Sequence, residues 1–347
     1  MNNAENGRPM RGSKKKVLVT GGAGYIGSVV GAHLLRAGYE VTALDDLSNG
    51  YEEAVPDGAE FVHGRIQDVR HVLDSSFGAV LHFAAFAEVG ESGRRPEKYW
   101  HNNVAGSLAL IDAMREANVR TLVFSSTCAV YGEPASLPIT EDTRTAPINP
   151  YGASKLAVDH MIASECGAHG LAAVSLRYFN VAGAFERYGE RHSPESHLIP
   201  LILQVAQGNR DSILVYGDDY PTPDGTCVRD YIHVADLAEA HLSALGAAEA
   251  GRHLICNLGN GRGYSVREVI EAARTVTGRP IPMIITHRRS GDPAVLIASA
   301  DRARHELGWE PRRSDLTGMM ADAWRFVQDV AGPTTPPISA DPTRTTT

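Results

Sequence analysis

The chain has 347 residues, of which 43% are hydrophobic, enough for a large buried core in one or two lobes. Its formal net charge of −8 argues against a non-specific nucleic-acid binder, whose surface would be basic. No apolar run is long enough to span a bilayer, and the polar, basic residues 1–16 lack the apolar core of a secretory signal. The four cysteines are widely spaced and form no zinc-binding pattern, so we expect reduced thiols in a cytoplasmic protein and no metal site.

Short apolar strands alternate with helical patterns along the first half of the chain. We expect strands at residues 16–20, 40–45, 79–83, 120–125 and 173–177, and helices at 25–37, 97–117 and 151–168. Strands and helices that alternate at these lengths are typical of βαβ units. The pattern predicts an α/β fold, a Rossmann-type doubly wound parallel sheet covered on both faces.

Beyond residue 180 turns become frequent and the elements shorten, with helical patterns at 234–249, 265–277 and 316–328. This change in the sequence pattern predicts a smaller mixed α/β lobe, which we expect to hold the substrate. The expected organisation is a disordered arm at 1–15, an NAD-binding Rossmann domain at 16–180, a substrate lobe at 181–330 and a disordered Pro- and Thr-rich tail at 331–347.

A glycine-rich turn lies directly between the first predicted strand and the first predicted helix. Gly21, Gly24 and Gly27 have the GxxGxxG spacing that lets a backbone approach a pyrophosphate at a helix N-terminus. The triplet alone also fits an ordinary turn, but its position after a strand and before a helix favours a dinucleotide site.

The second predicted strand ends in Asp45. A carboxylate there accepts hydrogen bonds from the adenosine ribose hydroxyls and repels a 2′-phosphate, so we expect NAD and not NADP. Asp45 and its neighbour Asp46 also fit a solvated strand-end turn.

Tyr151 and Lys155 are four residues apart at the start of a predicted helix, and therefore on one face of it. An ammonium group beside a phenol lowers the pKa of the tyrosine, and the nicotinamide of oxidised NAD adds a second positive charge. Together they would let Tyr151 act as a general base near neutral pH. The same pair occurs by chance on surface helices. Here it follows a strand that ends in Ser125-Ser126-Thr127, where hydroxyl groups reach the crevice that binds ligands in open α/β sheets.

A series of motifs in fixed order carries a resemblance to a known family. They are GGAGYIGS, HFAAFAEVGES, NNVAGSLALIDAM, FSSTCAVYG, NPYGASK, RYFNVAGA and GTCVRDYIHVADLA. Over residues 16–324 the chain resembles the extended short-chain dehydrogenases/reductases. It is most similar to their UDP-glucose 4-epimerase group, above all in the late segment YGDDYPTPDGTCVRDYIHV.

The resemblance implies roles for individual residues. Tyr151 would be the catalytic base, Lys155 would hold the nicotinamide ribose, and Thr127 would form a hydrogen bond with the reacting sugar hydroxyl. Besides Gly21, Gly27 and Lys155, the positions implied for NAD are Gly24, Tyr25, Ile26, Asp45, Asn49, Ile66, Phe83, Ala84, Asn103, Ser125 and Tyr178. Besides Thr127 and Tyr151, those implied for the UDP-sugar are Asn180, Leu198, Tyr216, Arg229, Arg289 and Asp292.

The two arginines suit a diphosphate clamp, although alone each also fits an ordinary surface arginine. Arg65 replaces a common aspartate at the adenine and cannot accept its hydrogen bond. His197 replaces a common asparagine beside the substrate. Leu296 matches a position that lines the sugar pocket in the family, but its apolar neighbours fit a core leucine equally well.

The resemblance also implies a reaction. Tyr151 would take the proton of the sugar 4-hydroxyl while C4 gives a hydride to NAD, and the 4-keto sugar would turn and accept both back on its other face. The expected activity is interconversion of UDP-glucose and UDP-galactose. The alternatives are a UDP-N-acetylglucosamine or UDP-uronate 4-epimerase, a nucleotide-sugar 4,6-dehydratase, and a non-catalytic NAD sensor.

Two features bear on those alternatives. Dehydratases of the family carry Asp-Glu directly after the threonine, whereas Cys128 and Ala129 stand here. The Thr/Tyr/Lys set supplies a catalytic base, which a non-catalytic sensor would not need.

Family members are commonly dimers, so the resemblance implies a homodimer formed through helices 97–117 and 151–168. It also implies a UDP-sugar as the substrate and neither nucleic acid nor membrane as a partner.

Overall fold

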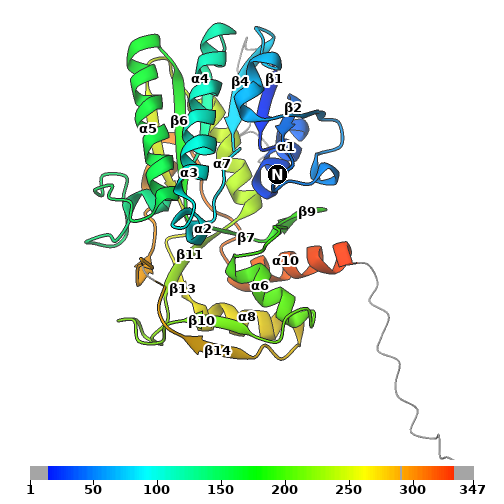
Figure 1. Cartoon of the computed structure of the whole chain (residues 1–347), viewed down its shortest axis with the longest axis vertical. Coiled ribbons are helices and arrows are strands. Elements are labelled where there is room, and N and C mark those ends of the chain that lie inside the picture. Colours follow the sequence, from blue (N-terminus) through cyan, green and yellow to red (C-terminus); the bar gives the residue numbers. More distant parts are fainter. Residues whose placement is uncertain (1–14, 290, 332–347) are drawn as a thin grey trace, which may run out of the picture.

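A computed structural model describes residues 15–289 and 291–331 of the chain (Figure 1). The predicted disordered arm and tail lie, apart from residues 15 and 331, outside the described residues. Within these ranges, none of the helices combines the length and apolarity that crossing a membrane requires.

The core of the molecule is a seven-stranded sheet whose neighbouring strands all run parallel, in the order β12-β6-β5-β4-β1-β2-β3. The strands are β1 (Lys16–Thr20), β2 (Glu40–Asp45), β3 (Glu60–His63), β4 (Phe77–His82), β5 (Thr121–Thr127), β6 (Ala172–Tyr178) and β12 (His253–Leu258). This topology confirms the predicted Rossmann-type fold. The sequence pattern did not predict β3 and β12.

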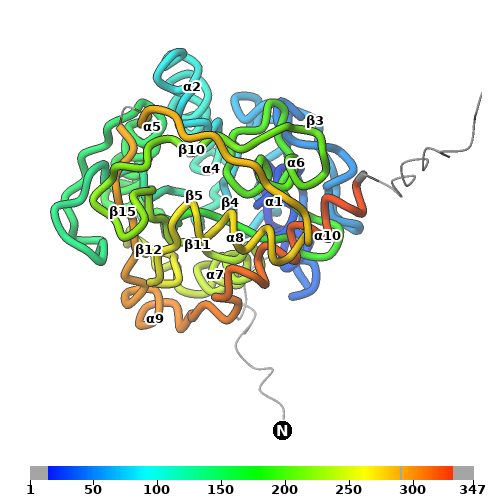
Figure 2. Tube along the Cα trace, turned by 90° about the horizontal axis from the view of Figure 1, so that it is seen from below, coloured from blue at the N-terminus to red at the C-terminus, as the bar shows by residue number. Residues whose placement is uncertain are grey.

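Helices cover both faces of this sheet because successive strand residues point to opposite sides. Val17 and Val19 of β1 pack with α1 (Tyr25–Arg36) and α7 (Val234–Ala247). Leu18, between them, packs with α4 (Gly106–Glu116) and α5 (Pro150–His169). Figure 2 shows β4 and β5 with α4 and α5 on one side and α7 on the other.

The helix expected over 97–117 is interrupted. A short α3 (Pro96–Tyr99) leads into a wide π-helical turn, η3 (Trp100–Ala105), and only then into α4. Such turns add a residue to the helix and are frequent at functional sites. Here the turn brings Asn102 to the wall of a large cleft.

A smaller lobe lies below the main sheet in Figure 1 and packs around its own apolar core. It contains the parallel pair β10 (Ile213–Tyr216) and β14 (Met283–Thr286), and a sheet of β7 (Asn180–Ala182), β11 (Val228–His233), β13 (Gly263–Ser265) and β15 (Val295–Leu296). Its helices are α6 (Leu198–Ala206), α8 (Val266–Thr277) and α10 (Leu316–Ala331). Helix α8 begins with a capping box, in which Ser265 and Glu268 each bond the other's backbone N–H.

Short elements complete the fold. They are β8 (Ala184–Phe185), β9 (Tyr188–Gly189), α2 (Val89–Ser92), α9 (Asp301–Leu307) and the 3-10 turns η1 (Glu52–Ala54), η2 (Ile66–His71) and η4 (Cys128–Tyr131).

The chain does not stay in the smaller lobe after residue 180. Helix α7 and strand β12 come from the range expected to form the substrate lobe, yet α7 packs on the main sheet and β12 pairs with β6 at its edge. Helix α9 joins the same core through Ala303 and Leu307. The main sheet therefore takes part of its core from residues well beyond 180.

A buried ion pair ties α5 to β6. The guanidinium of Arg177 donates to the Asp159 carboxylate at 2.9 and 3.1 Å, and their side chains are only 5% and 3% exposed. Arg177 also donates to the Tyr131 hydroxyl, which donates to the Asn257 side chain in β12. This hydrogen-bond network connects strands β6 and β12 with helix α5 and the turn η4.

Candidate active site

A cleft of about 1520 Å³ runs between the carboxyl ends of the main strands and the smaller lobe. It is lined by residues from both parts, as expected for ligand sites in open α/β sheets. The predicted site residues that line it are Gly21, Gly24, Tyr25, Ile26, Gly27, Asp45, Asn49, Ile66, Phe83, Ala84, Ser125, Thr127, Tyr151, Lys155, Tyr178, Asn180, Leu198, Tyr216, Arg229, Arg289 and Asp292. Asn103 is the one member of the predicted set that does not.

Asn103 lies directly behind the wall of the cleft and is 2% exposed. Its side chain accepts from the Phe86 N–H at 2.9 Å and donates to the Phe86 carbonyl at 3.0 Å. It also donates to the Ser154 hydroxyl at 3.1 Å. These contacts hold the segment after β4 against α5, so the structure gives Asn103 a supporting position and places Asn102 at the cleft.

The glycine turn at the start of α1 has no room for side chains. Gly21 has a φ of +71°, and a Cβ on Gly27 would lie 2.1 Å from the Gly21 carbonyl oxygen. Helix α1 has no side-chain cap at Gly24 and no acidic residue in its first turn. Its first N–H groups and the positive end of its dipole are therefore suited to a pyrophosphate, as NAD binding requires.

Asp45 is fixed at the end of β2 by two backbone groups. Its carboxylate accepts hydrogen bonds from the N–H groups of Ala23 at 3.0 Å and Leu47 at 2.9 Å. Burial raises the pKa of Asp45, and these two bonds oppose the rise. A rigid carboxylate in the cleft beside the glycine turn fits the ribose hydroxyls of NAD and disfavours the 2′-phosphate of NADP. Arg65, by contrast, is exposed and lies outside the residues that line the cleft.

The catalytic candidates converge at the end of β5. Helix α5 begins there with Asn149, whose side chain accepts from the Gly152 N–H at 2.8 Å, and with Pro150 in its first turn. This start places Tyr151 near Thr127, which lowers its pKa, and one turn later brings the Lys155 ammonium into the cleft. Lys155 donates to the Ser125 carbonyl at 2.7 Å and lies 4.8 Å from the centre of the Phe124 ring.

In the protein chain without its cofactor, burial dominates the acid–base properties of the pair. Burial raises the pKa of Tyr151 to about 12, and the hydrogen bond with Thr127 only opposes the rise. Burial lowers the pKa of Lys155 itself to about 7, against the charge of Asp159. The protein chain by itself therefore keeps Tyr151 protonated at neutral pH.

Two cationic side chains line the opposite part of the cleft, in the smaller lobe. Arg229 is 14% exposed, donates to the Val228 carbonyl at 2.9 Å and lies 3.6 Å from the Asp292 carboxylate. Arg289 is exposed, and its guanidinium carbon lies 3.8 Å from the centre of the Tyr216 ring. Held by a carboxylate and an aromatic face, the two guanidinium groups are positioned to bind a diphosphate.

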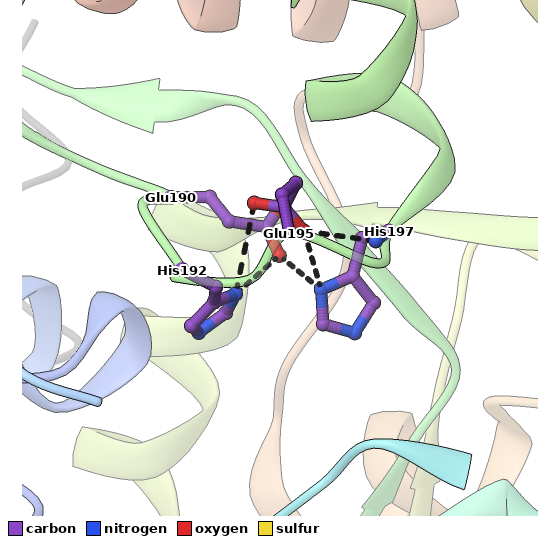
Figure 3. A group of neighbouring side chains, drawn as sticks. All are labelled: Glu190, His192, Glu195 and His197. Atoms are coloured by element: carbon purple, nitrogen blue, oxygen red, sulfur yellow. Dashed lines mark hydrogen bonds and ion pairs between the residues drawn. The ribbon is translucent and has the colours of Figure 1, made fainter. Parts of the chain in front are cut away.

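Four further side chains of the cleft wall gather between β9 and α6. Glu190, His192, Glu195 and His197 have one potential ligand atom each, and these atoms all lie within 4.8 Å of one another (Figure 3). Burial lowers the pKa of His197, but the carboxylates of Glu190 and Glu195 outweigh it and raise the value well above normal. Sequence reasoning singled out His197 alone; the spacing ExHxxExH is the signal that would have found the group.

Comparisons with known proteins show to which family the chain is similar. The sequence model of the NAD dependent epimerase/dehydratase family matches residues 17–259. A UDP-glucose 4-epimerase of Streptomyces lividans is 63% identical over 316 residues, which cover 90% of this chain and 95% of that protein. The crystal structure of a Brucella ovis UDP-glucose 4-epimerase in complex with NAD is similar, with a TM-score of 0.85 and 45% identity over 90% of this chain and 98% of the other.

A Bifidobacterium longum UDP-glucose 4-epimerase, solved in complex with NAD+ and UDP, also has a TM-score of 0.85. It is 39% identical, over 90% of this chain and 97% of that chain.

Proposed function

The chain belongs to the NAD dependent epimerase/dehydratase family, and within it we propose that it interconverts UDP-glucose and UDP-galactose. One observation carries the proposal: Tyr151, Thr127 and Lys155 line the same cleft as the dinucleotide turn and the paired arginines. This arrangement joins a hydride carrier, a proton-transfer group and a diphosphate anchor, which together are what epimerisation at C4 needs.

Bound NAD supplies the hydride acceptor and donor, and the protein supplies the proton transfer. Tyr151 takes the proton of the sugar 4-hydroxyl as C4 is oxidised, and returns it when C4 is reduced. Thr127 lines the same part of the cleft, where its hydroxyl would hydrogen-bond the reacting sugar hydroxyl. Lys155 is buried in the same part of the cleft, and in its protonated form its charge would favour the phenolate.

The smaller lobe holds the part of the substrate that does not react. Arg229 and Arg289 bind the diphosphate, so the nucleotide stays fixed while the 4-keto sugar turns about its bond to the phosphate. A cleft of about 1520 Å³ is larger than most small-molecule sites, which suits one that holds both NAD and a UDP-sugar.

The dehydratase alternative lacks its acid and base. Cys128 follows Thr127, and burial raises the pKa of its thiol to about 12, so it stays neutral at physiological pH. Ala129 carries no functional group. Nothing at these positions can remove and deliver the protons of an elimination across C5 and C6.

The proposal extends to the enzyme's assembly and location. We propose a homodimer formed through the helical segments 97–117 and 151–168. Support comes from Trp100 and Leu108, which are 43% and 48% exposed although large and apolar. The four cysteines are free thiols, which suits the cytoplasm.

The proposed reaction is tested by supplying purified protein with UDP-galactose, UDP-N-acetylgalactosamine or UDP-galacturonate and identifying the products. We expect fastest conversion of UDP-galactose, to UDP-glucose. Preferred turnover of either other sugar would reassign the substrate. A 4-keto-6-deoxy product would indicate a dehydratase, and no turnover of any of the three would contradict the epimerase assignment.

The size of the side chain at position 296 is expected to control sugar choice. Leu296 lines the cleft, yet it is 8% exposed and packs with Phe179 and Ile139, so it is also part of a core cluster. We expect Leu296→Ala to raise turnover of UDP-N-acetylgalactosamine relative to UDP-galactose by about tenfold, since pocket volume is worth about 1–3 kcal/mol in discrimination. Leu296→Tyr should lower the same ratio.

The matched control is Leu307→Ala, which removes a buried leucine of α9 outside the cleft and should leave the ratio unchanged. If neither Leu296 variant moves the ratio, sugar choice is decided elsewhere in the cleft.

A further inference from the structure

The segment between β9 and α6 carries a group of side chains that the proposed reaction does not use. We propose that Glu190, His192, Glu195 and His197 bind one divalent transition-metal ion, of which Zn²⁺ fits the donors best. Two imidazole nitrogens with two carboxylate oxygens are a donor set typical of Zn²⁺ in proteins, and one that Mn²⁺, Co²⁺ and Ni²⁺ also accept.

The spacing of the donor atoms matches a single ion at their centre. The His197 Nδ1 atom lies 2.8 Å from Glu190 Oε1 and 3.5 Å from Glu195 Oε1. The His192 Nδ1 atom lies 3.6 Å from Glu190 Oε1 and 3.9 Å from Glu195 Oε2. Ligands about 2.1 Å from a tetrahedral Zn²⁺ are about 3.4 Å apart, within the range of these four distances.

The two imidazole Nδ1 atoms are buried, and carboxylate oxygens are their neighbours. Among residues 15–289 and 291–331, neither His192 Nδ1 nor His197 Nδ1 has a hydrogen bond of acceptable geometry, although each lies near carboxylate oxygens. A buried polar atom without a partner is costly and needs an explanation. Both Nδ1 atoms face the space between the carboxylates in Figure 3, which is where a cation would satisfy all four groups.

The carboxylates are held in place before any ion binds. Glu195 is 5% exposed, and its Oε1 atom accepts the backbone N–H groups of Ser196 at 2.7 Å and His197 at 2.8 Å. Glu190 is 13% exposed and follows β9 directly. A preorganised site of this kind loses little entropy on binding and favours affinity.

The position of the site suggests what the ion does. His197 caps the start of α6, and the next residue, Leu198, lines the cleft where the substrate is expected. An ion bound at this point would pin the 190–197 segment to the start of α6 and fix one wall of the cleft. It would act by positioning the wall and not as a reactant.

The test uses the full chain, made without a histidine tag and freed of metal with a chelator. Titration with Co²⁺ should give the strong visible absorption of a four-coordinate ion, saturating at about one ion per chain, and Zn²⁺ should abolish it by displacement. His192→Ala should weaken binding by more than about 100-fold, since even groups that only support a ligand contribute 10–100-fold. The control is His169→Ala, which breaks an exposed single pair with Glu165 on α5 and should change nothing.

Retained NAD and an unchanged far-ultraviolet spectrum show whether a variant is folded. If His192→Ala fails that check, His197→Asn serves in its place and should lose the absorption equally. Absence of saturable Co²⁺ binding in the unmutated protein overturns the proposal, as does equal binding by the folded variant. The result stands apart from the enzymatic activity, because absorption and stoichiometry are read without substrate.

Discussion

Replacement of Tyr151 by phenylalanine is expected to lower kcat by roughly 100-fold or more, the usual size of a general acid–base contribution. The variant loses only the hydroxyl that exchanges a proton with the sugar. The ring, the helix start at Asn149 and the Lys155 bond to the Ser125 carbonyl remain. Steady-state kinetics with UDP-galactose measure the loss, and calorimetry should show UDP binding that is nearly unchanged.

The control for this variant is Tyr39→Phe, which removes a phenol hydroxyl from a half-buried tyrosine outside the cleft and should leave kcat as it is. Turnover near that of the unmutated protein in Tyr151→Phe, with NAD still bound, would remove Tyr151 from the chemistry. The raised pKa of the phenol makes the experiment informative, because burial alone keeps this group protonated at neutral pH.

Replacement of Arg177 by methionine should lower the free energy of unfolding by about 3–5 kcal/mol, since it leaves one charge of a buried pair without its partner. Asp159 and Arg177 are 3% and 5% exposed, so solvent cannot take the place of the lost guanidinium. The variant also leaves the Tyr131 hydroxyl without one of its donors. Denaturant unfolding at a fixed, saturating NAD concentration measures the effect, because bound ligand adds to apparent stability.

Arg115→Met provides the matched comparison. Arg115 pairs with Asp112 at 2.6 Å on the surface, where the two side chains are 46% and 39% exposed. Exposed pairs contribute about 0–1 kcal/mol, so this variant should unfold almost like the unmutated chain. Equal losses in the two variants would mean that burial does not set the contribution of the Arg177 pair.

The sequence predicted the parts of the fold that have a clear local pattern. Residues 16–20 and 40–45 are apolar runs beside turn signals, and they form β1 and β2 with the expected bounds. Strand β12 was missed because its apolar run lies in a region of frequent turns, and only its pairing with β6 makes it part of the main sheet. A short window of sequence contains no signal of such long-range pairing.

The predictions for the site likewise depend on whether a residue belongs to a local pattern. The glycine turn and the Tyr151/Lys155 spacing are local patterns, and both reach the cleft as expected. Asn103 was assigned by resemblance, but the π turn directs it to Phe86 and Ser154 behind the wall. A helical repeat cannot anticipate that turn, since a π turn shifts every following side chain around the axis.

The histidine–glutamate group escaped prediction for a different reason. Residues 190–197 have no regular secondary structure, so no periodicity indicates where their side chains point. The pKa values of Tyr151 and Lys155 could not be predicted from the sequence either, because they depend on burial. The pairing of Lys155 with the Ser125 carbonyl also depends on how β5 and α5 pack.

The repeated return of the chain to the main sheet bears on how this protein unfolds. A fragment ending at residue 180 would leave β6 as a bare edge and would lack the apolar side chains that α7, β12 and α9 add to the sheet's core. The smaller lobe, in turn, consists of segments whose ends are anchored in the main sheet. Neither part contains its whole core in one continuous stretch of chain, so the two parts are interdependent and should melt in a single cooperative transition.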